Sequence, residues 1–97
     1  MLLGKKMKIY QSRIFAKKVK KLTKVQKASL DEEIKIIVRD PEIGTEKKGD
    51  LRGIFIHKFK IQTLQYLLSY RFNENEIELI MLGPHENYYQ QLKNYIK

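Results

Sequence analysis

Histidine, lysine and tyrosine side chains in the second half of the chain have the types and spacing that phosphodiester cleavage requires. Cutting RNA without a metal needs a base for the 2′-hydroxyl proton, cations for the phosphorane charge, and an acid for the leaving 5′-oxygen. Histidine is the side chain best suited to exchange a proton near neutral pH. The sequence has two histidines, His57 and His85, which are therefore the candidates for acid–base chemistry.

His85 follows Gly83-Pro84, a pair that predicts the start of a helix because proline is tolerated in a first turn. A histidine in that turn would lie where backbone N–H groups attract phosphate. Tyr89, four residues on, would share its helical face and could stack on a base or hydrogen-bond the scissile phosphate. We predict that His85 is the catalytic acid or base, with Tyr89 beside it. The alternatives are a His85 that only hydrogen-bonds nearby backbone and a Tyr89 that only packs.

Basic side chains near the histidines are candidates for phosphate binding. Lys58 and Lys60 are two residues apart in a predicted strand, so their side chains point to the same face. Arg52 precedes this strand, and Arg71 lies on the next one. We predict that the two lysines, with one of the arginines, bind and stabilise phosphate. His57 is predicted to be structural or to support the site rather than to be catalytic.

The elements that must position these residues begin with a strand and two helices. Residues 7–11 predict a short strand, and Ser12 is a suitable N-cap for a helix whose apolar residues share a face. Thr23 and Gln26 have the spacing of a capping box that starts a second helix. Asp40-Pro41 ends this helix, because the residue before proline is pushed out of the helical region. Almost no linker separates the two helices, so we predict a helical hairpin.

The rest of the chain predicts a sheet and a last helix. Residues 42–50 predict a loop, and residues 54–72 are dense in the β-branched and aromatic types that favour strands. A turn signal follows at residues 73–75, and a further strand at residues 77–82. The face of the last helix that packs on the sheet is predicted to consist of Tyr88, Leu92, Tyr95 and Ile96. The order predicts one small α+β domain: N-terminal strand, helical hairpin, three-stranded antiparallel meander and C-terminal helix.

The charge of the chain restricts the kind of partner that it can bind. Lys and Arg total 20 against 11 Asp and Glu, which gives a net charge of +9. Residues 1–30 hold ten basic residues and no acidic residue. Such a field attracts a polyanion or an acidic protein, and the plainer alternative is a solvated lysine-rich helix.

Several classes of site are excluded or disfavoured. The lack of cysteine excludes disulfides and thiolate zinc sites, and two widely separated histidines predict neither a metal site nor a cofactor. No apolar stretch reaches the roughly 18 residues of a membrane span, and the start of the chain lacks the apolar segment of a signal peptide. We therefore expect a cytoplasmic protein. Residues 1–6 are predicted to be an extension ahead of a domain at residues 7–97.

The order of elements and several short segments resemble the RelE/ParE toxin superfamily over about residues 7–96. Leu51-Arg52-Gly53 before a strand is common in that family, and Lys58 and Lys60 resemble the paired strand lysines of the RelE ribonucleases. Gly83-x-His85-x-x-x-Tyr89 resembles the ending of the YafQ branch. The resemblance implies a RelE-like fold with both histidines on the concave face of the sheet. The catalytic residues that it implies are Lys58, Lys60, His85 and Tyr89. The residues that we predict to bind RNA or phosphate are Arg52, Arg71, His57, Lys93, Lys17 and Lys21.

The resemblance also implies a function: the toxin of a type II toxin–antitoxin system, which inhibits translation as a ribosome-dependent mRNA endonuclease. The implied partners are a cognate acidic antitoxin, the ribosome and mRNA, with a monomeric free toxin that forms a hetero-oligomer with its antitoxin. Two alternatives stay open: a ParE-like inhibitor of DNA gyrase, and a catalytically silent RNA- or protein-binding module of the same fold. His85, Tyr89 and the lysine pair argue against the gyrase inhibitor. Leu67, where RelE carries a strand arginine, gives weight to the silent module.

Overall fold

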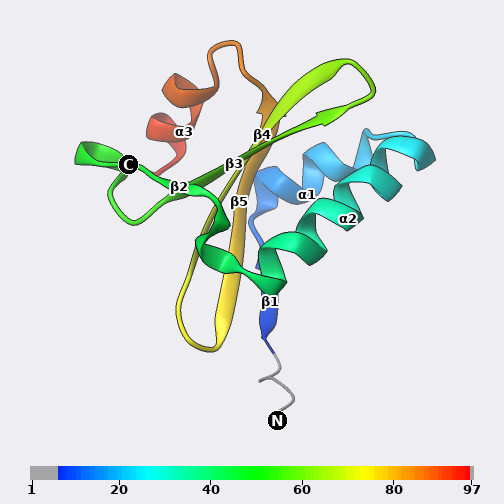
Figure 1. The fold of residues 1–97 in the computed structure, drawn as a ribbon. Helices are drawn as coiled ribbons and strands as arrows, with labels where there is room; N and C mark the ends of the chain where they lie inside the picture. The colour runs from blue at the N-terminus through cyan, green and yellow to red at the C-terminus, as the bar shows by residue number, and fades with distance from the viewer. Residues whose placement is uncertain (1–6, 97) are drawn as a thin grey trace, which may run out of the picture.

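The computed structural model describes residues 7–96, so the predicted extension at residues 1–6 lies outside the described part of the chain. The described residues form a five-stranded sheet with helices on both faces (Figure 1). The predicted α+β class and the order of its helices and main strands are confirmed. The elements are β1 (Lys8–Gln11), α1 (Arg13–Lys20), α2 (Lys24–Arg39), the 3₁₀ turn η1 (Pro41–Ile43), β2 (Thr45–Glu46), the 3₁₀ turn η2 (Gly49–Leu51), β3 (Phe55–Ile61), β4 (Leu64–Phe72), β5 (Glu76–Pro84) and α3 (Tyr88–Ile96).

The sheet has the strand order β1-β5-β4-β3-β2. β1 pairs with β5 in parallel, and the other neighbours pair antiparallel, which confirms the predicted meander of β3, β4 and β5. β2 was not predicted: Thr45 pairs with Ile56 and Glu46 with Phe55, inside the segment predicted to be a loop. A strand of two residues has no periodicity of its own, so only its partner reveals it.

Both helices of the N-terminal hairpin start at the predicted caps. The Ser12 hydroxyl accepts a hydrogen bond from the Phe15 N–H at 3.0 Å and donates to the Ile80 carbonyl at 2.6 Å. Thr23 and Gln26 form the reciprocal capping box. Caps of this kind stabilise a helix by about 1 kcal/mol each. Because the Ser12 bond to Ile80 also crosses to β5, the start of α1 is tied to the sheet.

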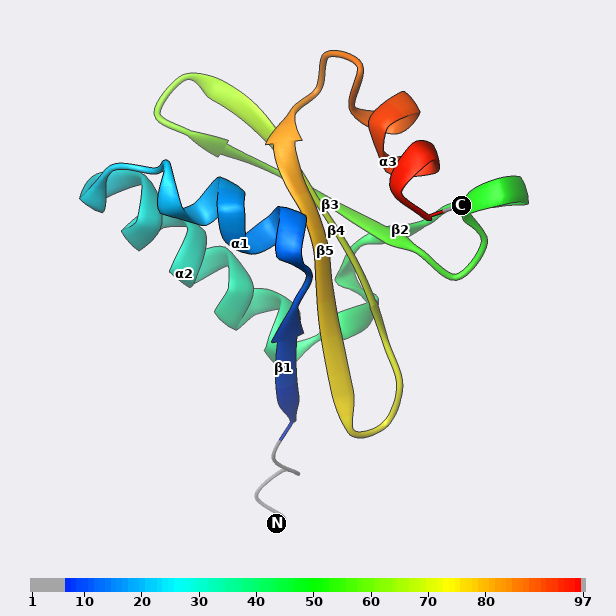
Figure 2. The same cartoon turned by 180° about the vertical axis from the view of Figure 1, so that it is seen from behind.

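Two hydrophobic clusters lie on opposite faces of the sheet. Figures 1 and 2 show the α1–α2 hairpin on one side of the strands and α3 on the other. The cluster under the hairpin includes Phe15, Leu30, Ile37, Phe59, Leu68, Tyr70 and Ile77. The cluster under α3 consists of Leu51, Ile54, Ile56, Leu67, Ile80, Met81, Tyr88 and Leu92. Since successive side chains of a strand point to opposite faces, adjacent residues of β3 and β4 are divided between the two clusters.

Tyr88 fixes the start of α3 to the sheet. Its hydroxyl hydrogen-bonds to the Met81 carbonyl oxygen at 2.7 Å and to Ser69 Oγ at 2.9 Å. Burial raises the pKa of the Tyr88 phenol well above its ordinary value, so the hydroxyl stays protonated. The predicted packing of Tyr88 is confirmed, but that of Tyr95 is wrong, because 43% of its surface is exposed. Leu92 is the last fully buried residue of α3, and the half-buried Ile96 packs against the same cluster, so the predicted packing of these two residues is confirmed.

The last helix begins later than predicted. Gly83 and Pro84 belong to β5, where they pair with Leu67 and Tyr66, so the prediction that they open the helix is wrong. The fixed φ of proline suits a helix start and also the end of a strand, and here the pairing with β4 decides. A turn in which Asn87 has a φ of 58° then leads into α3.

Candidate functional site

Lys58 and Lys60 lie on the face of the sheet that α3 partly covers. Lys58 pairs with Leu67, and Leu67 pairs with Gly83, so these residues form a row across β3, β4 and β5. Leu67 is buried in the cluster under α3, and residues paired across strands point to the same face. Both lysine side chains are exposed, whereas Phe59 between them is buried in the opposite cluster. The prediction that the two lysines share a face is confirmed.

His85 and Tyr89 meet at the end of this row. His85 follows Gly83 by two residues, and its ring meets the Tyr89 ring edge-on with 5.9 Å between the centroids. Adjacent strands lie about 4.8 Å apart, so the backbone of Lys58, two strands away, is about 10 Å from that of Gly83. Tyr89 packs against the cluster under α3, which places it on the same face as the lysines. The structure therefore brings the predicted histidine, tyrosine and lysines to one side of the sheet.

The surroundings of His85 differ from the prediction. His85 lies in the turn before α3, so the expectation that it occupies the first turn of a helix is wrong, and so is the expected effect of the helix N-terminus. Its carbonyl accepts a hydrogen bond from the Tyr88 N–H at 3.2 Å. Its exposed imidazole has no hydrogen-bond partner within residues 7–96, where the one imidazole bond belongs to His57. The ring is thus open to a substrate, which argues against a purely backbone-bonding role.

Lys47 is a further residue of the site that the sequence did not reveal. Its Nζ lies over the ring of Tyr89, 4.9 Å from the centroid. Lys47 follows β2, and its N–H donates to the Ile54 carbonyl at 2.8 Å, which continues the pairing of β2 with β3. In the sequence it is one of two adjacent lysines in a predicted loop, and no pattern distinguishes it from Lys48. Only the pairing of β2 with the sheet brings it to Tyr89.

A basic groove lies on the other side of the end of β5. β1 pairs with β5 only as far as Leu79, so within residues 7–96 no strand borders that edge farther along. The groove is lined by Ile14, Lys17, Lys18 and Lys21 on one wall and by residues including Gly83 and Pro84 on the other. Lys17 and Lys21 therefore lie beside the same end of β5 as the His85–Tyr89 pair. Lys93, also predicted to bind RNA, is exposed on α3, one turn after Tyr89.

His57 lies on the opposite face of the sheet, so the expectation that it shares the concave face with His85 is wrong. Its Nε2 lies 2.7 Å from Oε1 of Glu33 on α2, and its ring stacks on Phe59 with 5.8 Å between the centroids. The side chains of His57 and Glu33 are only 12% and 24% exposed. The alternation of β3 causes this placement, because His57 is adjacent to Lys58 and must point the other way. The structural role that we predicted for His57 fits this position, and phosphate binding does not.

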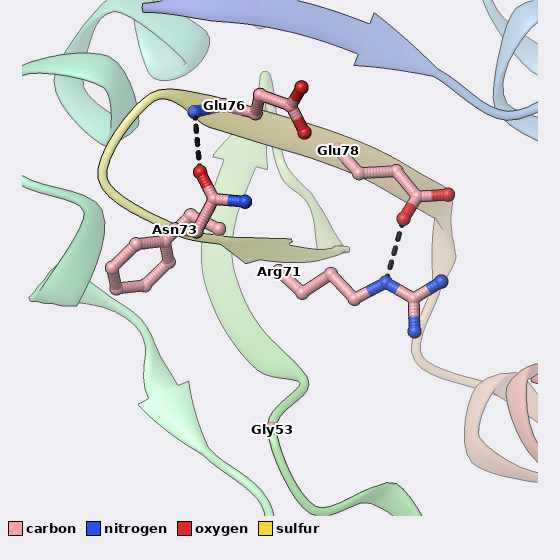
Figure 3. A pocket seen from close by; sticks show the side chains of 6 residues that line it. Gly53, Arg71, Asn73, Glu76 and Glu78 are labelled. Atoms are coloured by element: carbon pink, nitrogen blue, oxygen red, sulfur yellow. Dashed lines mark hydrogen bonds and ion pairs between the residues drawn. The ribbon is translucent and has the colours of Figure 1, made fainter.

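Arg71 lies near the end of β4 that is farther from Lys60, and Arg52 lies in the turn before β3, at the same end of the sheet. Along β4, Arg71 is four residues from Leu67, which is about 13 Å in a strand. Figure 3 shows Arg71 in a pocket with Gly53, its Nε donating to Oε1 of Glu78 at 2.7 Å. Arg52, next to Gly53, is exposed in the turn before β3. The predicted grouping of the lysine pair with Arg71 is therefore wrong, because the length of β4 separates them and Glu78 already pairs with the arginine.

No group of three or more histidine, aspartate or glutamate side chains among residues 7–96 is arranged to hold a metal ion. Among the same residues, no helix has the length and apolar character that crossing a membrane would demand.

Comparisons with known proteins agree on the fold. Residues 9–93 match the family model described as the ParE-like toxin of type II bacterial toxin–antitoxin systems. No curated protein sequence matches the chain significantly. A mutant of the E. coli toxin RelE in the free state is similar in structure, with a TM-score of 0.71, 15% identity and 94% of each chain covered.

Two other solved structures are similar to a comparable degree. One is the intact E. coli RelBE toxin–antitoxin complex, with a TM-score of 0.66, 18% identity, and 82% of this chain and 98% of the other covered. The second is a YoeB/ParE toxin from Agrobacterium tumefaciens, with a TM-score of 0.65, 18% identity, and 81% and 99% covered. At these identities the likeness shows a shared RelE-like fold.

Proposed function

The chain belongs to the ParE-like toxin family of type II bacterial toxin–antitoxin systems, and from this premise we propose that it inhibits translation by cutting mRNA on the ribosome. The observation that carries the proposal is that the His85–Tyr89 pair lies on the same face of the sheet as the exposed Lys58 and Lys60. These side chains can supply a proton-transfer group and cations to a bound phosphodiester. The proposed reaction takes place in the cytoplasm, where translating ribosomes are.

The proposed cleavage assigns one role to each side chain. A base takes the proton of the 2′-hydroxyl, the 2′-oxygen bonds to phosphorus, the bond to the 5′-oxygen breaks, and an acid protonates that oxygen. His85, with its open imidazole, acts as that base or acid. Lys58 and Lys60 stabilise the charge that develops on the phosphate oxygens, which is the effect expected to lower the barrier most. Tyr89 holds the ring of His85 in place and offers its own ring to a base.

Leu67 supports the strongest competing proposal, a catalytically silent binding module. Its side chain is fully buried under α3, so this position of β4 adds no cation to the site. Lys58 and Lys60 still supply cations on this face, and Lys47 supplies one over the ring of Tyr89. We propose that they suffice, because stabilisation of a phosphorane depends on the charge near its oxygens rather than on one particular arginine.

An acidic antitoxin is the proposed protein partner. The family is defined by toxin–antitoxin pairs, and one similar structure is a RelBE complex. The net charge of +9 favours association with an acidic chain through electrostatic steering. The groove beside Lys17, Lys18 and Lys21 combines this charge with an edge of β5 that no strand among residues 7–96 borders, and an extended peptide can add there as a strand. A peptide seated there would lie next to His85 and obstruct the site.

The decisive experiment is induced expression of the wild type beside His85→Ala in bacteria, with growth followed and mRNA ends mapped. We expect growth arrest with new 5′ ends inside translated codons in the wild type, and neither in His85→Ala. Glu86→Ala, an exposed residue of the same turn, is the matched control and should behave as the wild type. Arrest with intact mRNA and DNA damage would instead indicate a gyrase inhibitor. Growth without arrest, at normal protein levels, would indicate the silent module.

A further inference from the structure

We propose that Lys47 is a positioning residue for Tyr89: its ammonium group fixes the orientation of the Tyr89 ring beside His85. This inference rests on the proposed ribonuclease function for its consequence in activity. The contact itself is a property of the free protein and can be tested without any substrate.

The backbone of Lys47 is held by the sheet. Thr45 and Glu46 pair with β3, and the Lys47 N–H donates to the Ile54 carbonyl at 2.8 Å, so the edge of the sheet determines where the side chain starts. Lys47 is half-buried, whereas Lys48 is exposed. Among residues 7–96, no carboxylate lies within ion-pair distance of Lys47, and its ammonium group lies over an aromatic ring instead. Such an arrangement is a cation–π interaction.

Tyr89 is held from the other directions by aromatic contacts. Tyr88 meets its ring edge-on with 5.8 Å between the centroids, and Tyr88 is anchored by its hydrogen bonds to Ser69 and Met81. The His85 ring also meets the Tyr89 ring edge-on, with 5.9 Å between the centroids. Lys47 lies over one face of the ring, so a base cannot stack on that face. Lys47 therefore adds a third contact to the Tyr89 ring, beside those of Tyr88 and His85.

The role of Lys47 predicts a specific pattern of variants. Lys47→Met keeps the length of the side chain and removes the charge, while Lys47→Arg keeps a cation that binds aromatic rings. A cation–π contact of this exposure corresponds to about a two- to fivefold effect. We expect Lys47→Met to lower the single-turnover rate constant for ribosome-bound mRNA about two- to fivefold and Lys47→Arg to restore it. Lys48→Met, the exposed neighbour, should leave the rate unchanged.

A double-mutant cycle separates positioning from direct RNA contact. If Lys47 acts through the Tyr89 ring, Lys47→Met should have no further effect on the rate in a Tyr89→Leu background. An equal loss in both backgrounds would overturn the proposal and assign Lys47 to phosphate contact. Normal thermal unfolding of each variant shows that the comparison is between folded proteins.

NMR of the free protein tests the contact independently of activity. The ring current of Tyr89 should displace the Lys47 side-chain methylene resonances upfield, and Tyr89→Leu should abolish the displacement. Lys47 resonances at ordinary positions would overturn the proposal even if the protein cleaves mRNA. A displaced resonance in a protein that leaves mRNA intact would support the contact while the ribonuclease proposal fails.

Discussion

The ring of His85 meets the ring of Tyr89 edge-on, 5.9 Å between centroids, although the first lies in a turn and the second in α3. The contact is possible because Tyr88 fixes the helix start to the sheet through Met81 and Ser69. The position of the proposed catalytic imidazole thus depends on the packing of Tyr88 and Tyr89, the first two residues of α3. The geometry leads to five predictions.

The two β3 lysines should contribute to the chemical step. Lys58→Met and Lys60→Met are each expected to lower the single-turnover rate constant by about a hundredfold, because each removes a cation from the phosphorane charge. The control is Lys35→Met, at an exposed lysine of α2 that pairs with Glu32. A loss confined to substrate affinity at low salt would show that the lysines act only in general electrostatic attraction.

The ring of Tyr89, rather than its hydroxyl, is predicted to matter most. Tyr89→Phe keeps the contacts with Lys47, Tyr88 and His85 and should remain within about threefold of the wild-type rate. Tyr89→Ala should lower the cleavage rate about ten- to a hundredfold, because it removes a ring on which a base can stack. Equal losses in the two variants, measured in the same cleavage assay, would assign the role to the hydroxyl.

The pair of His57 and Glu33 should stabilise the fold. Glu33→Ala is expected to lower the free energy of unfolding by about 1.5–3 kcal/mol, because it removes a charge-assisted bond between α2 and β3. Glu32→Ala, which breaks the exposed pair with Lys35, should cost less than about 0.5 kcal/mol. Urea denaturation in a His85→Ala background would measure both changes in the free energy of unfolding. Equal changes would contradict a stabilising role for the partly buried Glu33–His57 pair.

The buried phenols predict a loss of stability at high pH. Burial raises the pKa of Tyr88 and of Tyr70, so both keep their protons in the folded protein while unfolded tyrosine ionises near pH 10 (about its ordinary pKa). Their contribution to the free energy of unfolding is therefore complete below about pH 10 and lost as the pH rises above it. Urea denaturation between about pH 8 and pH 11 should show this fall. Tyr88→Phe should reduce its slope, and an unchanged slope would contradict the assignment.

Binding of an acidic antitoxin should depend on the groove beside β5. Replacing both Lys17 and Lys21 by Glu is expected to slow association with the antitoxin about tenfold at low salt, because both residues line the groove. The same replacement at Lys24 and Lys27, exposed at the start of α2, should slow it less. Rates measured in a His85→Ala background should converge at high salt, since screening removes the steering. Identical rates for both double variants would mean that only net charge matters.

The amino-acid sequence by itself determined the features that depend on near neighbours in the chain. The caps at Ser12, and at Thr23 with Gln26, lie where predicted because each is a bond within one helical turn. The end of α2 at Asp40 follows in the same way from the proline after it. The shared face of Lys58 and Lys60 follows from the two-residue period of a strand. The segments that indicated the RelE/ParE family also belong to this local kind of information.

Tertiary structure decided everything that depends on a partner strand or on the face a helix covers. Gly83-Pro84 became the end of a strand because Gly83 pairs with Leu67, which is far away in the sequence. The alternation of β3 points His57 away from Lys58, but only the packing of α2 on that face brings Glu33 to it. Lys47 contacts the ring of Tyr89 because the two-residue strand β2, which precedes it, pairs with β3. Contacts of this kind form between segments distant in sequence, and no local periodicity encodes which segments will meet.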